Sequence, residues 1–155
     1  MTPQPKKCKD CAAEGIESLR PTPHPGPRCA THHRKRRKAV SEAAHGNRIE
    51  NLYGITSEQY WALYEAQGGR CAICQRATGK SKRLAVDHDH RAGCGHDPKH
   101  GCPQCIRGAC CTTCNVILLG RYNIDSLARA IHYLLDPPAQ KVLNPHHEKT
   151  SGTTR

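Results

Sequence analysis

Apolar residues fall in short groups along the chain, and their spacing predicts several small helices. Tyr60, Leu63 and Tyr64 recur at i, i+3 and i+4, which places them on one helical face. Thr56 or Ser57 is a suitable N-cap for this helix. We expect it to be a packing helix with no chemistry of its own.

Two further helices are expected towards the C-terminus. The apolar run 116–119 predicts a buried helix face that ends at Gly120. An amphipathic helix should open at Asp125 or Ser126, and it should end at residues 136–138 because proline cannot continue a helix.

The middle of the chain predicts two strands followed by a helix. Residues 84–88 form a short apolar stretch that ends in polar groups, which predicts a strand, and residues 105–110 predict a second strand. A helix should follow from about Thr112. Upstream, the basic run 34–38 and the alanines behind it predict a helix of about three turns that stops at Gly46. The predicted fold class is therefore α+β.

The apolar material is thin for a chain of 155 residues. Only 36% of the residues are hydrophobic, 4% are aromatic and none is Phe, and such a chain usually needs disulfides or metals to hold its fold. No apolar run follows the first Met or approaches the ~20 residues of a membrane span, so we expect a cytoplasmic location. Disulfides are rare there, and the odd count of eleven Cys together with eleven His favours zinc.

The net charge of +11 points to a polyanionic partner, with nucleic acid first and no membrane. The basic residues that we expect to contact DNA phosphates are clustered in one run, namely Arg34, Lys35, Arg36, Arg37 and Lys38. Such contacts supply affinity and salt dependence but not sequence choice. The alternative is a basic protein whose charges form a solvated face.

Three sets of cysteine and histidine have the spacing of metal ligands. Four thiolates suit a closed, structural zinc site, which we predict at Cys71, Cys74, Cys111 and Cys114. An N-terminal zinc knuckle would use Cys8, Cys11, Cys29 and either His32 or His33. A third site between the predicted strands would use Cys94, Cys102, Cys105 and one of His96, His100 or Cys110, of which we select His100. The alternatives to the last two sites are a disordered arm and an exposed loop with spare thiols.

Asp87, His88 and Asn115 carry the candidate chemistry. The first two end a predicted strand, and Asn115 follows a zinc ligand in the first turn of the predicted helix. Carboxylate and amide oxygens suit Mg²⁺ or Mn²⁺, and a histidine beside them can take a proton from water at neutral pH. These groups and a basic surface are what phosphodiester hydrolysis requires. The alternative for residues 87–90 is a polar surface loop or further zinc ligands.

From Tyr53 to Pro138 the chain resembles the recombination endonuclease VII family of phage-type His-Asn-His (HNH) nucleases. The most specific matching segments are Gln67–Cys74, Val86–His90, Arg107–Gly108 and Cys111–Asn115. The resemblance implies that Asp87 and Asn115 hold the catalytic ion, that His88 is the general base, and that His90 positions or polarises the scissile phosphate. It also implies zinc at the four cysteines 71, 74, 111 and 114. We expect Arg107 to contact DNA.

The fold that the resemblance implies is a small zinc-stapled ββα-metal (His-Me finger) core with flanking helices. We expect a knuckle and basic arm over 1–50, the nuclease domain over 51–138 and a disordered tail over 139–155. The expected function is metal-dependent hydrolysis of DNA, including branched or junction DNA, during phage DNA processing in the host cytoplasm. Nothing after Pro138 matches the family's dimer-forming segment, so a homodimer has no evident support. The alternative is a non-catalytic zinc protein that binds nucleic acid.

Overall fold

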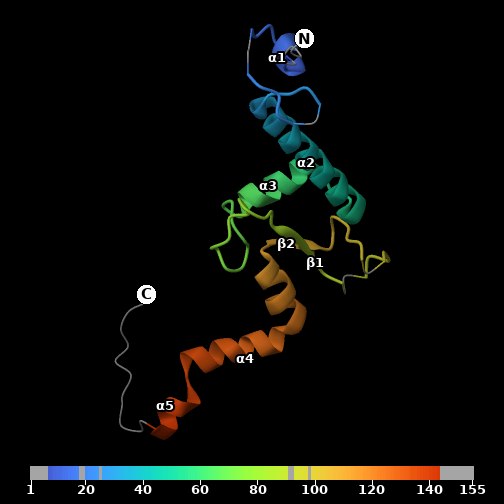
Figure 1. Ribbon diagram of the computed structural model, residues 1–155. Helices are drawn as coiled ribbons and strands as arrows, with labels where there is room; N and C mark the ends of the chain where they lie inside the picture. Colours follow the sequence, from blue (N-terminus) through green and yellow to red (C-terminus); the bar gives the residue numbers. More distant parts are fainter. Residues whose placement is uncertain (1–6, 18–19, 25, 91–92, 98, 144–155) are drawn as a thin grey trace. The chain divides into compact units, whose positions relative to one another are not determined.

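The computed structural model describes residues 7–17, 20–24, 26–90, 93–97 and 99–143 (Figure 1). The elements follow in the order α1 (Lys9–Ala13), α2 (Ala30–Tyr53), α3 (Ser57–Ala66), β1 (Ala85–His88), β2 (Ile106–Cys110), the π-helix η1 (Thr113–Leu119), α4 (Ile124–Leu135) and α5 (Pro138–Leu143). Strands β1 and β2 form one two-stranded sheet. The predicted mixture of helices with a small sheet, including both strands, is confirmed.

The chain divides into two compact units. The first comprises Met1–Gly68 and His88–Gly108, and the second comprises Gly69–Asp87 and Ala109–Arg155. The first unit therefore contains helices α1, α2 and α3, and the second contains η1, α4 and α5. None of the helices in the described ranges is long and apolar enough to cross a membrane.

Helix α2 is the longest element, with 24 residues. The predicted stop at Gly46 is wrong, because an interior glycine costs only about 1 kcal/mol relative to alanine and a packed helix can absorb that cost. The helix ends instead at Gly54, whose φ of 63° is the left-handed conformation that glycine adopts readily at a helix C-terminus. At Gly46 an added Cβ would lie 3.5 Å from the Cβ of Ser57, so this position lies against the start of α3.

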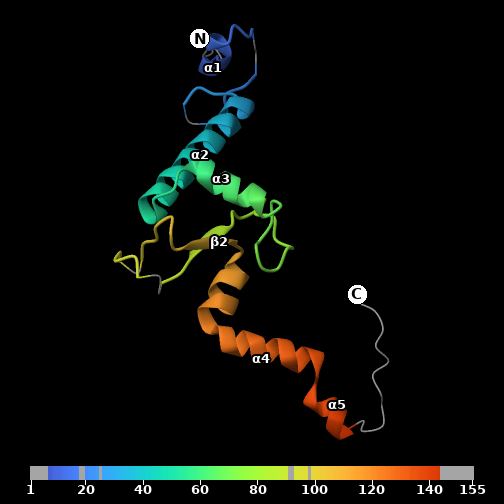
Figure 2. The same cartoon turned by 180° about the vertical axis from the view of Figure 1, so that it is seen from behind.

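Helix α3 packs against α2 within the first unit (Figures 1 and 2). Its start is the expected N-cap: the Thr56 hydroxyl accepts a hydrogen bond from the Gln59 N–H, and the Gln59 side chain accepts one from the Thr56 N–H. Tyr60 is buried, and its ring meets His45 of α2 edge-on at 4.8 Å. The predicted packing face of this helix is thus confirmed at Tyr60.

The helices of the second unit leave much apolar surface exposed. The predicted buried face over 116–119 is wrong at its first half, since Val116 is 60% and Ile117 48% exposed. Helix α4 begins after Asn123, whose side chain accepts a hydrogen bond from the Ser126 N–H, and it ends before Pro137 as predicted. Its residues are also largely exposed, because an apolar stripe marks a face but not whether anything in the chain covers it.

Candidate metal centres and nuclease residues

Three clusters of cysteine and histidine each bring their ligand atoms within 4.8 Å of one another. Their members are Cys8, Cys11, Cys29 and His32; Cys71, Cys74, Cys111 and Cys114; and Cys94, His96, Cys102 and Cys105. These clusters take in ten of the eleven cysteines, all of which are free thiols. Each cluster could hold zinc, and the preference for metals over disulfides inferred from composition agrees with this arrangement.

The N-terminal cluster has the geometry of a tetrahedral site. The Nδ1 of His32 lies 3.4 Å from the sulfur of Cys8, 3.3 Å from that of Cys11 and 3.4 Å from that of Cys29. Ligand atoms around a tetrahedral zinc are separated by about 3.5 to 3.8 Å, given the usual zinc–nitrogen and zinc–sulfur lengths. Between the two histidines left open by the sequence, the structure brings His32 to the cysteines.

Glu14 supports this cluster from outside. The Nε2 of His32 lies 2.9 Å from a carboxylate oxygen of Glu14, and the ammonium of Lys35 lies 3.4 Å from the other oxygen. A carboxylate that accepts from one imidazole nitrogen directs the other nitrogen at the metal, which is a common arrangement around zinc. Sequence analysis missed Glu14, and its only signal was a carboxylate three residues after Cys11.

The pKa values of the thiols show why a cation fits the N-terminal cluster. Burial opposes ionisation of Cys8, but hydrogen bonds from the backbone at Cys29 and Cys11 and from His32 outweigh it and lower the pKa to about 6. Burial and the neighbouring sulfurs raise the pKa of Cys11 to about 11. The first thiol of the cluster ionises readily. Its negative charge then opposes ionisation of the next thiol, and a bound divalent cation removes that opposition.

The four-cysteine cluster of the second unit shows the same behaviour. The sulfurs of Cys74 and Cys111 are 3.9 Å apart, and the Cys111 N–H lies 3.3 Å from the sulfur of Cys71. Burial opposes ionisation of Cys71, but backbone hydrogen bonds outweigh it and lower the pKa to about 6, whereas burial and the other sulfurs raise the pKa of Cys114 to about 12. All four predicted ligands lie together here.

The third cluster contains His96 in place of His100. The Nε2 of His96 lies 3.4 Å from the sulfur of Cys105, whereas the Nδ1 of His100 lies 3.9 Å from a carboxylate oxygen of Asp97. The other alternative, Cys110, belongs to the second unit, where burial raises its pKa to about 12 and the charges of Cys71 and Asp87 add to the effect.

The candidate nuclease residues are distributed over both units and are described within each. In the second unit, Asp87 is only 6% exposed, and Asn115 directly follows the cluster residue Cys114. The Asn115 N–H donates to the Cys111 carbonyl at 2.9 Å, so the backbone at this position is tied to the four-cysteine cluster.

In the first unit, the ring of His88 meets the ring of Tyr53 edge-on at 5.5 Å, and it lies 4.3 Å from the ring of His90 at an angle of 52°. Its Nε2 atom is buried, and the described residues offer that atom no hydrogen bond, although the ring itself is well packed. The segment beyond it is anchored by two backbone hydrogen bonds: Asp89 N–H donates to the Cys105 carbonyl at 2.8 Å, and Gly101 N–H donates to the Leu52 carbonyl at 2.7 Å.

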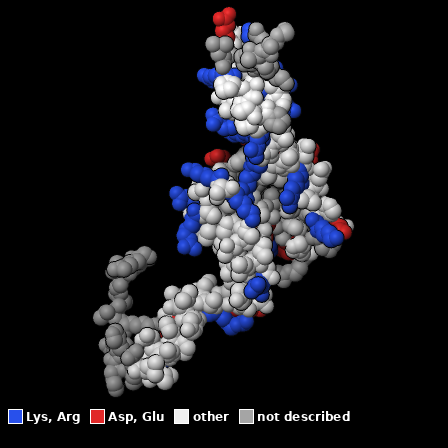
Figure 3. Space-filling model, in the orientation of Figure 1, with Lys and Arg blue, Asp and Glu red and all other residues white. Residues whose placement is uncertain are grey.

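The predicted basic run lies on α2 and faces solvent, in the part of the surface where Figure 3 shows many Lys and Arg side chains. Lys35 is paired with Glu14 and Lys38 with Glu42, and Arg34 is exposed. Arg36 and Arg37 line a cavity. Arg107, the remaining predicted DNA contact, is exposed on β2.

These features define a small protein of helices and a two-stranded sheet whose Cys and His clusters could hold zinc. The model of one family, recombination endonuclease VII, matches residues 46–136, and the chain belongs to that family. It is 52% identical over 140 residues to the Gene 59 protein of Mycobacterium phage D29, which covers 89% of this chain and 78% of the relative. The Gene 59 protein of Mycobacterium phage L5 is 51% identical over 140 residues, covering 89% and 79%. No solved structure matches the chain.

Proposed function

We propose that the protein is a metal-dependent DNA endonuclease of the HNH type, with a ββα-metal core formed by β1, β2 and η1. Membership of the recombination endonuclease VII family over residues 46–136 carries this proposal. The order strand, strand, helix, with Asp87-His88 at the end of β1 and Asn115 at the start of η1, supports it. Since the relatives belong to mycobacteriophages, we place its action in phage DNA processing in the host cytoplasm.

In this proposal Asp87 and Asn115 supply oxygen ligands for Mg²⁺ or Mn²⁺. Carboxylate and amide oxygens are the ligands that these ions prefer, and Asp87 is only 6% exposed, so it lies within the fold. When bound, the ion would offset negative charge on the scissile phosphate and on the leaving oxygen. Both side chains belong to the unit that contains the four-cysteine cluster, whose zinc would keep their backbone in place.

His88 would take a proton from the attacking water as the general base, and His90 would position or polarise the phosphate. Packing of the His88 ring against Tyr53 limits its rotation, which favours a single orientation of the ring. Hydrolysis would leave 5′-phosphate and 3′-hydroxyl ends. Arg107 and the basic residues of α2 would bind the DNA backbone, residues 1–50 would form a DNA-binding arm, and residues 51–138 would form the nuclease domain.

The test compares His88→Ala with wild-type protein on supercoiled plasmid and on a branched substrate, in zinc-containing buffer with and without Mg²⁺. Loss of a general base should lower cleavage by about 10²- to 10⁴-fold while zinc content and DNA binding are kept. His132→Ala is the control, because it removes an exposed histidine of α4. Full cleavage by His88→Ala would overturn this mechanism. Wild-type protein that binds DNA and never cuts it would establish the alternative, a non-catalytic zinc protein.

A further inference from the structure

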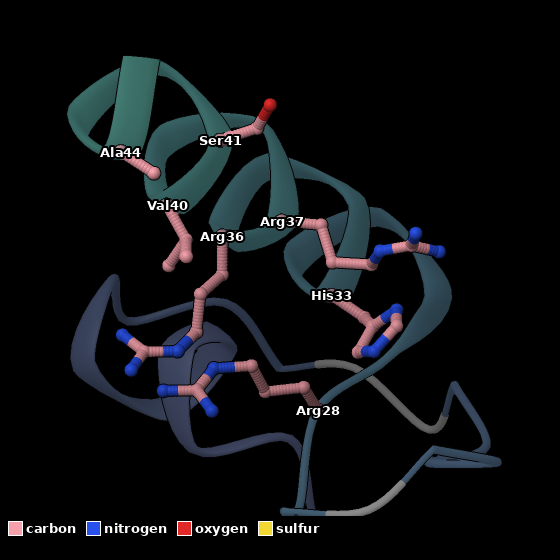
Figure 4. Close-up of a pocket in the computed structure, with 7 residues that line it drawn as sticks. All are labelled: Arg28, His33, Arg36, Arg37, Val40, Ser41 and Ala44. Carbon is pink, nitrogen blue, oxygen red and sulfur yellow. The ribbon is translucent and has the colours of Figure 1, made fainter. Parts of the chain in front are cut away.

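A cavity of about 380 Å³ lies beside the first half of α2, in the first unit (Figure 4). His33, Arg36, Arg37 and Val40 line it from the helix, and their spacing of three or four residues places them on one helical face. Arg28 lines it from the loop that precedes the helix. Three arginines therefore border one hollow that also has an apolar wall.

Arg28 is held in this position by a carboxylate. Its Nε lies 2.6 Å from an oxygen of Asp10, and its side chain is only 14% exposed. This ion pair uses Nε, and a guanidinium has two further nitrogens that can donate. In Figure 4 the guanidinium groups of Arg28 and Arg36 point into the same part of the hollow, whereas that of Arg37 extends to the side of His33. Like charges that line one hollow repel each other, and an anion bound there would relieve the repulsion.

The lysines of the same run are arranged differently. Lys35 lies 3.4 Å from Glu14, and Lys38 lies 3.8 Å from Glu42. Each of these lysines therefore has a neighbouring carboxylate and lies outside the cavity lining. The basic run is thus not uniform: Arg36 and Arg37 line the cavity, whereas Lys35 and Lys38 each have a neighbouring carboxylate.

The cavity also has surfaces that suit a sugar. Val40 is 55% exposed on its wall, and the ring of His33 stacks on His24 at 3.9 Å with an angle of 17° between the planes. Arg28 and His33 each adjoin a member of the N-terminal cluster, Cys29 and His32, so the loop and the helix start are held by the same cluster.

We propose that Arg28, Arg36 and Arg37 form a discrete binding site for the DNA backbone, with a phosphate at Arg28 and Arg36 and the adjoining deoxyribose against Val40 and the stacked histidines. Naming DNA as the ligand rests on the proposed nuclease function. Forked guanidinium donors match phosphate oxygens better than ammonium groups do, which is why the arginines rather than the lysines of the run matter here. The site contacts no base, so it acts equally on any sequence.

Two charge-matched double variants of the full chain test this site. Arg36→Ala/Arg37→Ala removes two cavity arginines, and Lys35→Ala/Lys38→Ala removes the same charge from the same turns of the helix. Binding to two fluorescent duplexes of unrelated sequence is measured by anisotropy over a salt series, in zinc-containing buffer without Mg²⁺. All four residues are exposed and alanine favours helix, so both variants should fold, as helical content and zinc content will verify.

The arginine variant should bind both duplexes about ten-fold more weakly, with a salt slope smaller by about one unit for one lost phosphate contact. The lysine variant should change affinity by less than about two-fold, because each lysine has a neighbouring carboxylate and lies outside the cavity lining. Equal losses in the two variants, or no loss in the arginine variant, would overturn the site. Plasmid cleavage by wild-type protein is measured in parallel. If wild-type protein cuts the plasmid but the two variants bind DNA equally well, the phosphate site is wrong and the nuclease assignment stands. If the variants differ in binding but wild-type protein does not cut, the nuclease assignment is wrong and the site stands.

Discussion

Gly101 shows how closely the backbone approaches the proposed base. An added Cβ would lie 2.9 Å from Cδ1 of Tyr53 and 3.2 Å from Cγ of His88, and the first of these distances is shorter than real Cβ contacts allow. The Gly101 N–H is also bound to the Leu52 carbonyl at 2.7 Å, so the backbone cannot easily move away. Only glycine fits between these two rings without displacing one of them.

Gly101→Ala should therefore shift the ring of His88. We expect kcat for plasmid cleavage to fall by about two- to ten-fold, because the His88 ring, at 3.2 Å, must move by a few tenths of an ångström, and a displacement near 1 Å at a reacting group can cost as much as 10² in rate. KM and zinc content should stay near the wild-type values, which separates misplacement of the base from loss of the fold. Unchanged kcat would mean that this contact does not position His88.

The identity of single ligands was the hardest part to predict at this scale. Cysteines of a Cys-x-x-Cys pair can be assigned from the sequence because one tight turn brings them together. The choice of His96 over His100 depends instead on the path of a loop, which local spacing does not determine. Glu14 is a similar case, since its carboxylate contacts His32, which lies eighteen residues away in the sequence.

At the level of elements, the sequence pattern predicted those features of helices and strands that depend on residues close together in the chain. Both strands, the N-cap of α3 and the end of α4 follow from residues that are neighbours in sequence. The length of α2 did not follow, because its continuation through Gly46 depends on packing against α3. The exposed residues Val116 and Ile117 make the same point, since their apolar pattern says nothing about a covering partner.

The two glycines of α2 give opposite predictions. Gly46→Ala should stabilise the protein by about 0.5 to 1 kcal/mol, because alanine is the better helix former and its Cβ meets Ser57 at an ordinary 3.5 Å. Gly54→Ala should destabilise it by about 1 kcal/mol or more, because alanine is strained at a φ of 63°. Urea unfolding of zinc-loaded protein measures both changes. A destabilising Gly46→Ala would show that α2 is interrupted at that residue.

For the whole molecule, metal content is the decisive measurement. Since three clusters within the described residues each bring four ligand atoms together, purified protein should contain three zinc ions at these sites. Cys71→Ser should lose one of them and unfold the second unit, because a structural zinc contributes on the order of 10 kcal/mol to folding. Metal analysis measures the loss of zinc, and near-UV circular dichroism measures the unfolding.

Cys110→Ala is the matched control, because Cys110 is 2% exposed and lies outside the three clusters. It should keep three zinc ions and lose only about 1 kcal/mol of stability through the small cavity it leaves. A variant at Cys71 that retains all three ions would contradict the four-cysteine assignment.

In the proposed function, the length of α2 also fixes a distance along the DNA, between a bound phosphate and the place of cutting. Arg37 at the cavity and Tyr53 beside His88 are sixteen residues apart in one continuous helix, which at 1.5 Å per residue is about 24 Å. Laid along duplex DNA at 3.4 Å per base pair, this rod reaches about seven base pairs. If the proposed site and the proposed nuclease function hold, a phosphate bound near Arg37 and a strand cut near His88 would be separated by a constant interval, and the protein would cover the DNA unequally on the two sides of the cut.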